Sequence, residues 1–384
     1  MKKLSLWITL CLMCVIANHS KANDFSDVEF IRTQSNISTS RQNAITRTVS
    51  SCSPAIVGIN VTEIRRGVTR SRSFWDDLFG FGMPRYREFE VAGIGSGFLI
   101  SPDGYILTNH HVAGNASKIV VTLTSGEKYD AEIIGSDLAS DVCLLKIKSN
   151  KRFPHLKFAD SDKTIVGEWA IAMGNPFGLF DINAKPVVTV GVVSNIGISF
   201  VNRDDNNFRI YKDMIQTDAA ISSGNSGGPL LNANGEVIGM NTVIFTTAAN
   251  SQGAGSIGIG FAIPINRVKR VVDLLMKDGT IARNLNIGMS VTEINERVAK
   301  YYRLERQDGV LVHQIDSRAA ASEAGIDVGD IIERVNGRRI MKPDDLLIAI
   351  GDAVVGDRLR FEILRGDKKM NITFNLPPPT QRRR

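Results

Sequence analysis

The chain has few cysteines, few aromatic residues and no strong excess of either charge. Four cysteines and 7% aromatic residues stand in 384 residues, and 46 basic side chains oppose 40 acidic ones. Outside the first 22 residues only Cys52 and Cys143 remain, which excludes a disulfide framework; buried free thiols are preferred over a single bridge. The one dense basic run, Arg382–Arg384, predicts a solvated tail and not a nucleic-acid site.

Long hydrophobic runs are also missing, except near the N-terminus. The apolar run Leu4–Ala17 has 14 residues in the sequence, short of the roughly 20 that span a bilayer. Two lysines precede it, and the small residues Ser20 and Ala22 follow. This pattern predicts a secretory signal cleaved before Asn23, with an uncleaved anchor as the alternative.

Glycine is abundant, with 34 residues, and it separates many short strand-like runs. About a dozen such runs between residues 51 and 276 predict a mainly β fold of barrels or sandwiches. A helical period occurs only at Ile265–Lys277. The segment 64–92 is rich in aromatic residues without a strand or helix period, so it is either a small cluster under a surface loop or a regulatory loop.

Three motifs in this β-rich region combine histidine, aspartate and serine. They are Thr-Asn-His-His-Val ending at Val112, Asp-Leu-Ala-Ser-Asp beginning at Asp137, and Gly-Asn-Ser-Gly-Gly-Pro beginning at Gly224. Each motif alone is weak, but the order histidine, aspartate, serine and the approximate spacing match a chymotrypsin-type protease. Spacing alone does not choose between His110 and His111.

The chemistry of peptide hydrolysis explains these residue types. A serine hydroxyl needs an adjacent base, histidine accepts its proton because its unperturbed pKa is about 6.5, and a carboxylate orients the imidazole. The glycines beside Ser226 let the amides of Gly224 and Ser226 point at the developing oxyanion, where one donor is typically worth about 2.7–4 kcal/mol. Asp137 and Asp141 both remain candidates for the acid.

These motifs resemble those of the HtrA (Deg or Do-like) serine proteases. The resemblance rests also on Ser-Asp-Val-Cys-Leu-Leu-Lys, Ala172–Gly178 and Gly258–Pro264. It implies that His111 is the base, that Asp141 is the acid, and that the triad with Ser226 lies in a cleft between two six-stranded β-barrels. It implies no metal and no organic cofactor, and the sequence contains nothing like a nucleotide site.

Specificity is predicted from the residues near the nucleophile. In chymotrypsin-like folds the residue six positions before the serine lies at the base of the S1 pocket, and here it is Ala220. No acid is available there for lysine or arginine, and the following strand supplies another wall through Ile257, Ile259 and Phe261. We expect cleavage after small or medium aliphatic residues.

The segment 284–376 resembles a PDZ domain, on Gly309–Val312, Gly329–Ile332 and Val335–Gly337. Such a domain binds a C-terminal peptide as an added strand while free amides hold its carboxylate. The carboxylate loop is predicted at Asn286, Ile287, Gly288 and Met289. Helix Pro343–Ile350 is expected to form the other wall.

The resemblance implies an ATP-independent endopeptidase that degrades unfolded or damaged proteins in the periplasm, with PDZ-regulated activity, possible chaperone activity, and a homotrimer or multiple of trimers. The alternatives are a membrane-linked regulatory protease that cuts one signalling partner, and a chaperone or binding scaffold. The predicted organisation is a signal peptide at 1–22, an arm at 23–50, a protease domain at 51–276, a linker at 277–283, a PDZ domain at 284–376 and a tail at 377–384.

Overall fold

The computed structural model describes residues 41–69, 85–175, 185–204, 207–222, 224–244, 258–304 and 308–378. The expected signal peptide, most of the arm, the centre of the segment 64–92, Ile257 and the last six residues lie outside this range. Helix α2 (Ala44–Cys52) falls in the predicted arm, where no helix was expected. Within the described residues, no helix is both long and apolar enough to cross a membrane.

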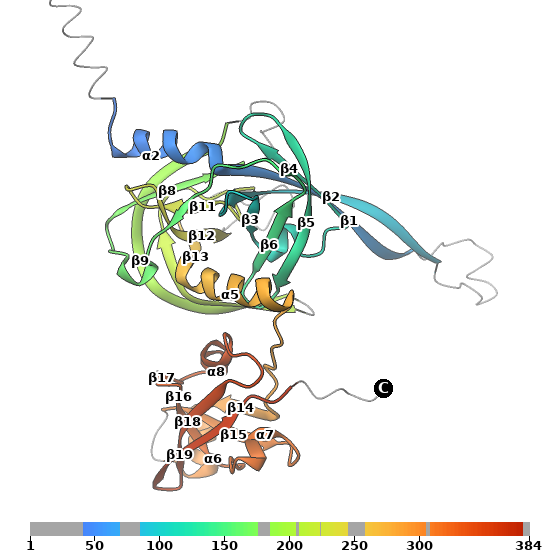
Figure 1. Cartoon of the computed structure of the whole chain (residues 1–384). Helices are drawn as coiled ribbons and strands as arrows, with labels where there is room; N and C mark the ends of the chain where they lie inside the picture. The colour runs from blue at the N-terminus through green and yellow to red at the C-terminus, as the bar shows by residue number, and fades with distance from the viewer. Residues whose placement is uncertain are drawn as a thin grey trace, which may run out of the picture. The chain divides into compact units, whose positions relative to one another are not determined.

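The first half of the protease region is a closed antiparallel barrel (Figure 1). Its inward side chains are aliphatic and aromatic and fully buried, as alternation along half-buried strands requires; Ile59, Phe98 and Leu144 are all 0% exposed. The barrel runs in the order β1-β2-β3-β6-β5-β4. The strands are β1 (Ile56–Thr69), β2 (Arg85–Leu99), β3 (Tyr105–Thr108), β4 (Lys118–Leu123), β5 (Lys128–Asp137) and β6 (Val142–Ile147).

The expectation of an irregular segment from Ile64 to Ala92 was wrong at both of its ends. Strands β1 and β2 pair in unbroken register from Ile56↔Phe98 to Thr69↔Arg85, well beyond the barrel. Figure 1 shows this pair projecting from the barrel as a long ribbon. Backbone pairing overrides the missing side-chain alternation here, since a two-stranded ribbon does not need a buried face in its outer part.

The second half forms another ring of strands, in the order β11-β8-β9-β10-β13-β12, which closes because β11 also pairs with β12; β7 adds to β12. Its core is built from small and aliphatic residues such as Ala170, Val193 and Ile238. The strands are β7 (Lys157–Phe158), β8 (Trp169–Gly174), β9 (Val187–Asp204), β10 (Asn207–Thr217), β11 (Pro229–Leu231), β12 (Glu236–Ile244) and β13 (Gly260–Pro264). The predicted pair of six-stranded, chymotrypsin-like barrels is confirmed.

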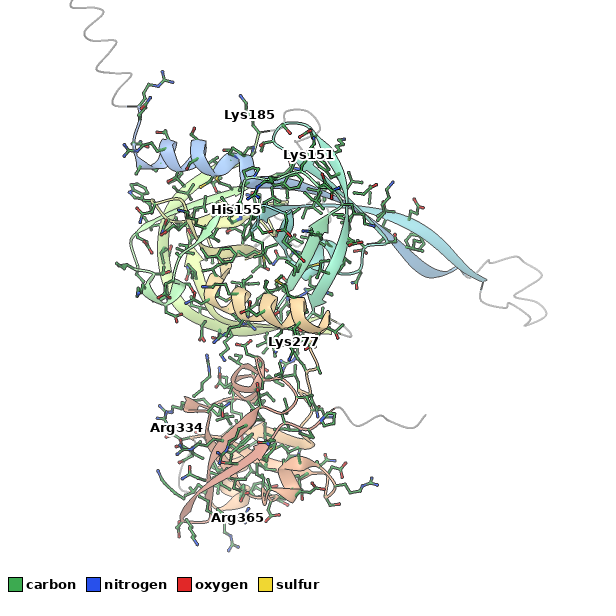
Figure 2. All side chains as sticks on the ribbon, viewed as in Figure 1. Lys151, His155, Lys185, Lys277, Arg334 and Arg365 are labelled. Carbon is green, nitrogen blue, oxygen red and sulfur yellow. The ribbon has the colours of Figure 1, made fainter. Side chains whose placement is uncertain are left out.

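Helix α5 (Ile265–Asp278) follows the second barrel and ends at Gly279, whose φ of 70° forms a left-handed C-cap. The predicted helix Ile265–Lys277 is therefore confirmed to within one residue. Figure 2 shows the labelled basic side chains at separate places, with Lys151 and Lys277 on different parts of the protease domain. The positive charges of these labelled residues are therefore not gathered in one patch.

The C-terminal region is a third, smaller sheet in the order β14-β15-β16-β18-β19, with β17 paired to β16. Phe361 and Leu359 lie at 0% exposure in its core. Its helices are α6 (Glu296–Tyr302), α7 (Ala320–Glu323) and α8 (Pro343–Ile350). Its strands are β14 (Met289–Glu293), β15 (Val310–Ile315), β16 (Ile331–Val335), β17 (Arg338–Arg339), β18 (Arg358–Arg365) and β19 (Lys368–Asn375).

Candidate active site

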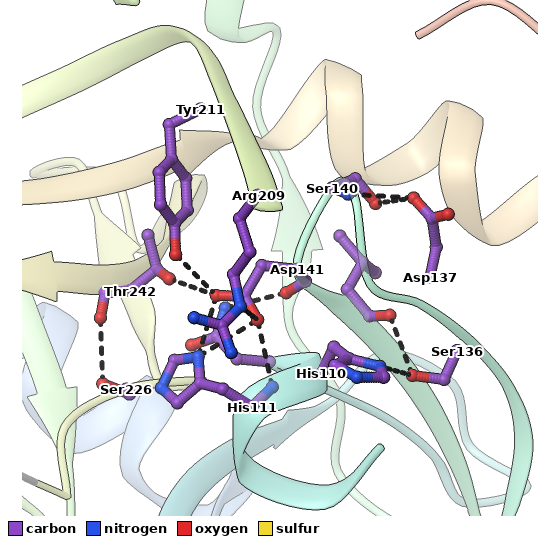
Figure 3. Close-up of polar contacts among 12 residues, drawn as sticks. His110, His111, Ser136, Asp137, Ser140, Asp141, Arg209, Tyr211, Ser226 and Thr242 are labelled. Carbon is purple, nitrogen blue, oxygen red and sulfur yellow. Dashed lines mark hydrogen bonds and ion pairs between the residues drawn. The ribbon is translucent and has the colours of Figure 1, made fainter. Parts of the chain in front are cut away.

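The fold brings the three polar motifs together (Figure 3). His111 lies in the one-turn helix α4 (His110–Ala113) after β3, and Asp141 lies in the turn between β5 and β6. Ser226 lies in the loop before β11 of the second barrel. The Nδ1 atom of His111 is 2.8 Å from Oδ2 of Asp141, and the His111 amide donates to Oδ1 at 3.0 Å. The carboxylate thus holds both the ring and the backbone of His111.

Asp141 is fully buried, and its φ of 58° lies in the left-handed region. The hydroxyl of Thr242 donates to its Oδ2 at 2.7 Å, and the phenol of Tyr211 donates to the same oxygen at 3.2 Å. Burial opposes ionisation, but His111 and these hydrogen bonds outweigh it and hold the pKa of Asp141 below its ordinary value. The carboxylate is therefore charged at neutral pH.

The two rival residues have other partners. His110 Nδ1 lies 2.6 Å from Ser136 Oγ. Asp137 accepts hydrogen bonds from the Ser140 amide and hydroxyl and from Arg283. Both histidines lie in the one-turn helix α4, but their rings have different neighbours. Of the two, only His111 contacts the buried carboxylate of Asp141.

The Ser226 hydroxyl donates to the carbonyl oxygen of Thr242 at 3.0 Å. A hydroxyl has one proton to donate, so in this conformation it is not directed at His111. Both residues nevertheless line the same cavity, of about 390 Å³. Apo active sites often show such loose catalytic contacts, which tighten when substrate binds.

Ser96 of β2 fixes the loop that carries Ser226. Its amide donates to the Ser226 carbonyl at 3.0 Å, and its hydroxyl donates to the Gly224 carbonyl at 2.5 Å. The same hydroxyl accepts the amide of Asn175 at 2.7 Å. Ser96 is 0% exposed. These bonds fix the orientation of the peptide bond after Gly224. That peptide bond in turn fixes the conformation of the turn that contains the Ser226 amide.

Glycine is required in this loop for two reasons. Gly224 has φ 94° and Gly227 has φ 85°, both in the left-handed region. A Cβ on Gly227 would also lie 2.2 Å from the Ser96 carbonyl oxygen. Within the described part of the chain, no backbone carbonyl accepts a hydrogen bond from the amides of Gly224 or Ser226, which were predicted to bind the oxyanion.

Three of the four predicted S1 residues lie within the described part of the chain. Ala220 is exposed between the buried Ala219 and Ile221, and its carbonyl accepts the Thr189 hydroxyl at 2.7 Å. The ring of Phe261 packs against Phe200 with centroids 5.5 Å apart. Ile259 is half-buried, and Ile257 lies outside the described residues. The S1 assignment stays a prediction.

The cavity beside Ser226 opens elsewhere, toward the β1–β2 ribbon. Among the described residues, the lining of this cavity is largely apolar and includes one carboxylate. It contains none of the predicted S1 residues. The lining residues are Val61, Glu63, Val91, Ala92, Gly93, Ile94, His111, Val112, Gly224 and Ser226.

In the C-terminal domain, the predicted carboxylate loop precedes β14. Gly288 has φ 80°, and a Cβ there would lie 2.0 Å from the Cβ of Ala319. The Gly288 amide donates to the side-chain oxygen of Asn286 at 3.1 Å, while Ile287 is buried in the core. An incoming carboxylate would have to replace the Asn286 oxygen at this amide.

The sequence patterns did not indicate four further residues at the site. Thr242 and Ser96 lie inside strand-like runs, where a hydroxyl residue is unremarkable. Strand β10 begins at Asn207, seven residues before the run Met214–Thr217 that the sequence predicts as a strand. Only pairing with β9 extends that strand, and it places Arg209 and Tyr211 beside Asp141.

The same two-domain organisation appears in known proteins. Residues 95–240 match the trypsin-like peptidase domain, and residues 285–376 match the PDZ domain. A probable periplasmic serine endoprotease DegP-like of Chlamydia trachomatis is 42% identical over 306 residues, which cover 78% of this chain and 58% of the relative. A relative of the same name from Pseudomonas putida is 37% identical over 349 residues, covering 86% of this chain and 69% of the relative.

A solved structure, the HtrA-type protease AlgW with a decapeptide, has 30% sequence identity and a TM-score of 0.65. The match covers 87% of this chain and 99% of the AlgW chain. The chain belongs to the HtrA family of serine endoproteases.

The HtrA resemblance read from the sequence is thereby confirmed, and so is the combination of a trypsin-like peptidase domain with a PDZ domain. The chain spans 58% of the length of the Chlamydia relative but nearly all of AlgW.

Proposed function

We propose that this chain is an ATP-independent serine endopeptidase that cleaves unfolded or damaged proteins in the periplasm. The observation that carries the proposal is the 2.8 Å contact of His111 with the buried Asp141, in a cavity shared with Ser226. Buried carboxylate, imidazole and serine in this relation are the parts of acyl-transfer catalysis. The periplasmic location rests on the names of the relatives and on the predicted signal peptide.

In the proposed mechanism the Ser226 hydroxyl first turns from Thr242 to the Nε2 atom of His111. His111 then takes the proton as Ser226 Oγ attacks the scissile carbonyl, and later returns it to the leaving amine. Asp141 keeps the imidazole in the tautomer with Nδ1 protonated and stabilises its cation. The amides of Gly224 and Ser226 would bind the oxyanion in the tetrahedral intermediate.

We propose that the P1 side chain contacts Ala220, Ile259 and Phe261. These side chains offer apolar contacts and carry no charge that would bind a P1 cation. Peptides with Val, Ala or Ile at P1 should therefore be cut faster than the same peptide with Arg. Measuring kcat/KM over a P1 series tests this, and faster cleavage after Arg would refute it.

The PDZ domain would bind C-terminal peptides and raise protease activity, and the assembly would be a homotrimer or a multiple of trimers. The described β14 and α8 supply the strand and helix between which a PDZ ligand lies. Sedimentation analysis and peptide titration of the protease activity test these two points separately.

The decisive experiment compares wild type with Ser226→Ala on a fluorescently labelled, reduced and unfolded protein, without nucleotide. Cleavage should require Ser226, whereas binding and suppression of aggregation should persist in the variant. Equal cleavage by both proteins would eliminate the proposed nucleophile. Binding without cleavage by wild type would instead favour a chaperone or scaffold with an idle triad.

A second candidate, predicted from the sequence, is a regulatory protease that cuts one membrane-linked partner. It requires that the apolar run Leu4–Ala17 is retained as an anchor and not removed with the signal. N-terminal sequencing of the exported protein would discriminate, since retention of residues 1–22 would favour an inner-membrane anchor. A regulatory enzyme would also leave generic unfolded proteins intact.

A further inference from the structure

A guanidinium group lies beside the candidate catalytic acid. The Nε atom of Arg209 is 3.7 Å from Oδ1 of Asp141, and the side chains are 20% and 0% exposed. Figure 3 shows Arg209 reaching this carboxylate from the same strand as Tyr211. The catalytic mechanism proposed above makes no use of this positive charge. It therefore calls for a role of its own.

The backbone that carries Arg209 is held firmly. The amide of Ile210 donates to the carbonyl of Ala139 at 2.8 Å, in the turn that leads to Asp141. Ile210 and Tyr211 are 0% and 1% exposed, and the Tyr211 phenol donates to the Asp141 carboxylate. Arg209 is thus positioned by its buried neighbours, unlike a surface ion pair whose geometry is loose.

The position of this charge determines its effect on the base. The Asp141 carboxylate favours protonation of His111, since it stabilises the imidazolium formed when Ser226 gives up its proton. A cation on the same carboxylate competes for the same negative charge and repels the imidazolium. Because the site is buried, water screens this competition only weakly.

We propose that Arg209 is a positioning residue that restrains catalysis by sharing the Asp141 carboxylate with His111. This inference rests on the proposed function, because it assumes that His111 is the base.

The other ionisable groups near the pair do not supply this charge. Burial and the Asp141 charge raise the pKa of Tyr211, and burial raises the pKa of the Cys143 thiol to about 12, so both stay neutral at physiological pH. Burial is also the main cause that lowers the pKa of His110, which favours its neutral form. Among the described residues, Asp137 is bound by Arg283, and the Glu63 carboxylate lines the cavity.

The test uses the full chain with Arg209→Gln, Arg209→Lys and, as a matched control, Arg270→Gln, which removes an exposed positive charge from α5. The substrate is an internally quenched peptide with Val at P1. In Arg209→Gln, the acid limb of the kcat/KM profile should move up by about one pH unit, and kcat at high pH should rise about threefold or more. Arg209→Lys and Arg270→Gln should follow wild type.

An activity-independent measurement separates this inference from the proposed function. In the Ser226→Ala background, the NMR titration midpoint of the His111 ring should rise by about one pH unit on adding Arg209→Gln. An unmoved midpoint, or a loss of kcat at every pH with an unmoved acid limb, would mean that Arg209 is only structural. Failure of wild type to cleave any peptide would refute the proposed function and leave the NMR result standing.

Discussion

The Ser226 hydroxyl is bonded to the Thr242 carbonyl, 3.0 Å away, while the Thr242 hydroxyl is bonded to Asp141, 2.7 Å away. One residue thus contacts the candidate nucleophile through its backbone and the candidate acid through its side chain. The proposed reaction begins with a rotation of Ser226 away from this carbonyl. Such a rotation between staggered side-chain conformers needs no movement of the backbone.

Replacing Asp141 and Asp137 separately distinguishes the two acids. Asp141→Asn should lower kcat by about 10⁴-fold, because an amide favours the wrong histidine tautomer. Asparagine tolerates the left-handed backbone, so the fold should persist. Asp137→Asn should retain most activity but weaken the buried contact with Arg283, at a cost of up to about 3–5 kcal/mol in unfolding free energy. Steady-state kinetics and denaturant unfolding of both variants measure this contrast.

Ser96→Ala should lower kcat with little change in KM. The variant leaves the Gly224 carbonyl and the amide of the buried Asn175 without their partner, and the loop bearing the Ser226 amide loses its fixed orientation. We expect about a 10- to 100-fold loss, comparable to partial loss of an oxyanion donor. Thr108→Ser, which keeps the hydroxyl that bonds the Ser96 carbonyl, is the control. A full-rate Ser96→Ala enzyme would contradict the role assigned to this clamp.

Gly227→Ala should be inactive and unstable, whereas Gly126→Ala should be mild. Both glycines have φ 85°, so an added methyl brings a similar backbone strain of about 1–2 kcal/mol. Only at Gly227 would the methyl also meet backbone, at 2.2 Å, while at Gly126 nothing lies within 4 Å. Thermal unfolding and active-site titration with a fluorophosphonate compare the two. Equal damage in both variants would show that packing around Gly227 is unimportant.

Asn286→Ala should tighten binding of a C-terminal peptide several-fold. The Asn286 side chain occupies the Gly288 amide that a ligand carboxylate needs, and its removal frees that donor. Gly288→Ala should abolish binding, and Gly337→Ala, with φ 82° and open space around it, should not. Fluorescence polarisation with a free-acid peptide and its C-terminal amide measures these effects. Equal binding of acid and amide would contradict the predicted carboxylate loop.

Much of the fold could be read from the sequence because strand and turn signals were local. The runs Tyr105–Thr108, Lys118–Leu123 and Val142–Ile147, which the sequence predicts as strands, are β3, β4 and β6 with the same bounds. The outer ribbon of β1 and β2 was not predicted, because only the pairing between the two strands defines its length. The start of β10 at Asn207 likewise follows from its pairing with β9.

At the site, sequence order identified the residue types but not the individual partners. Spacing left His110 and His111 equal; the 2.6 Å contact with Ser136 and the 2.8 Å contact with Asp141 separate them. No local sequence pattern indicated a role for Arg209, because its partner Asp141 lies 68 positions earlier in the chain. Such a contact exists only in the folded protein.

The bonds from Ser96 to Gly224 and Ser226 join the first barrel to the second. His111 and Asp141 likewise belong to the first barrel, and Ser226 to the second. A chain in which only one barrel has formed therefore possesses neither a nucleophile facing its base nor a fixed oxyanion loop. Peptide hydrolysis by the proposed triad therefore begins only after both barrels have closed, so the folding of the chain itself sets the moment at which the activity can appear.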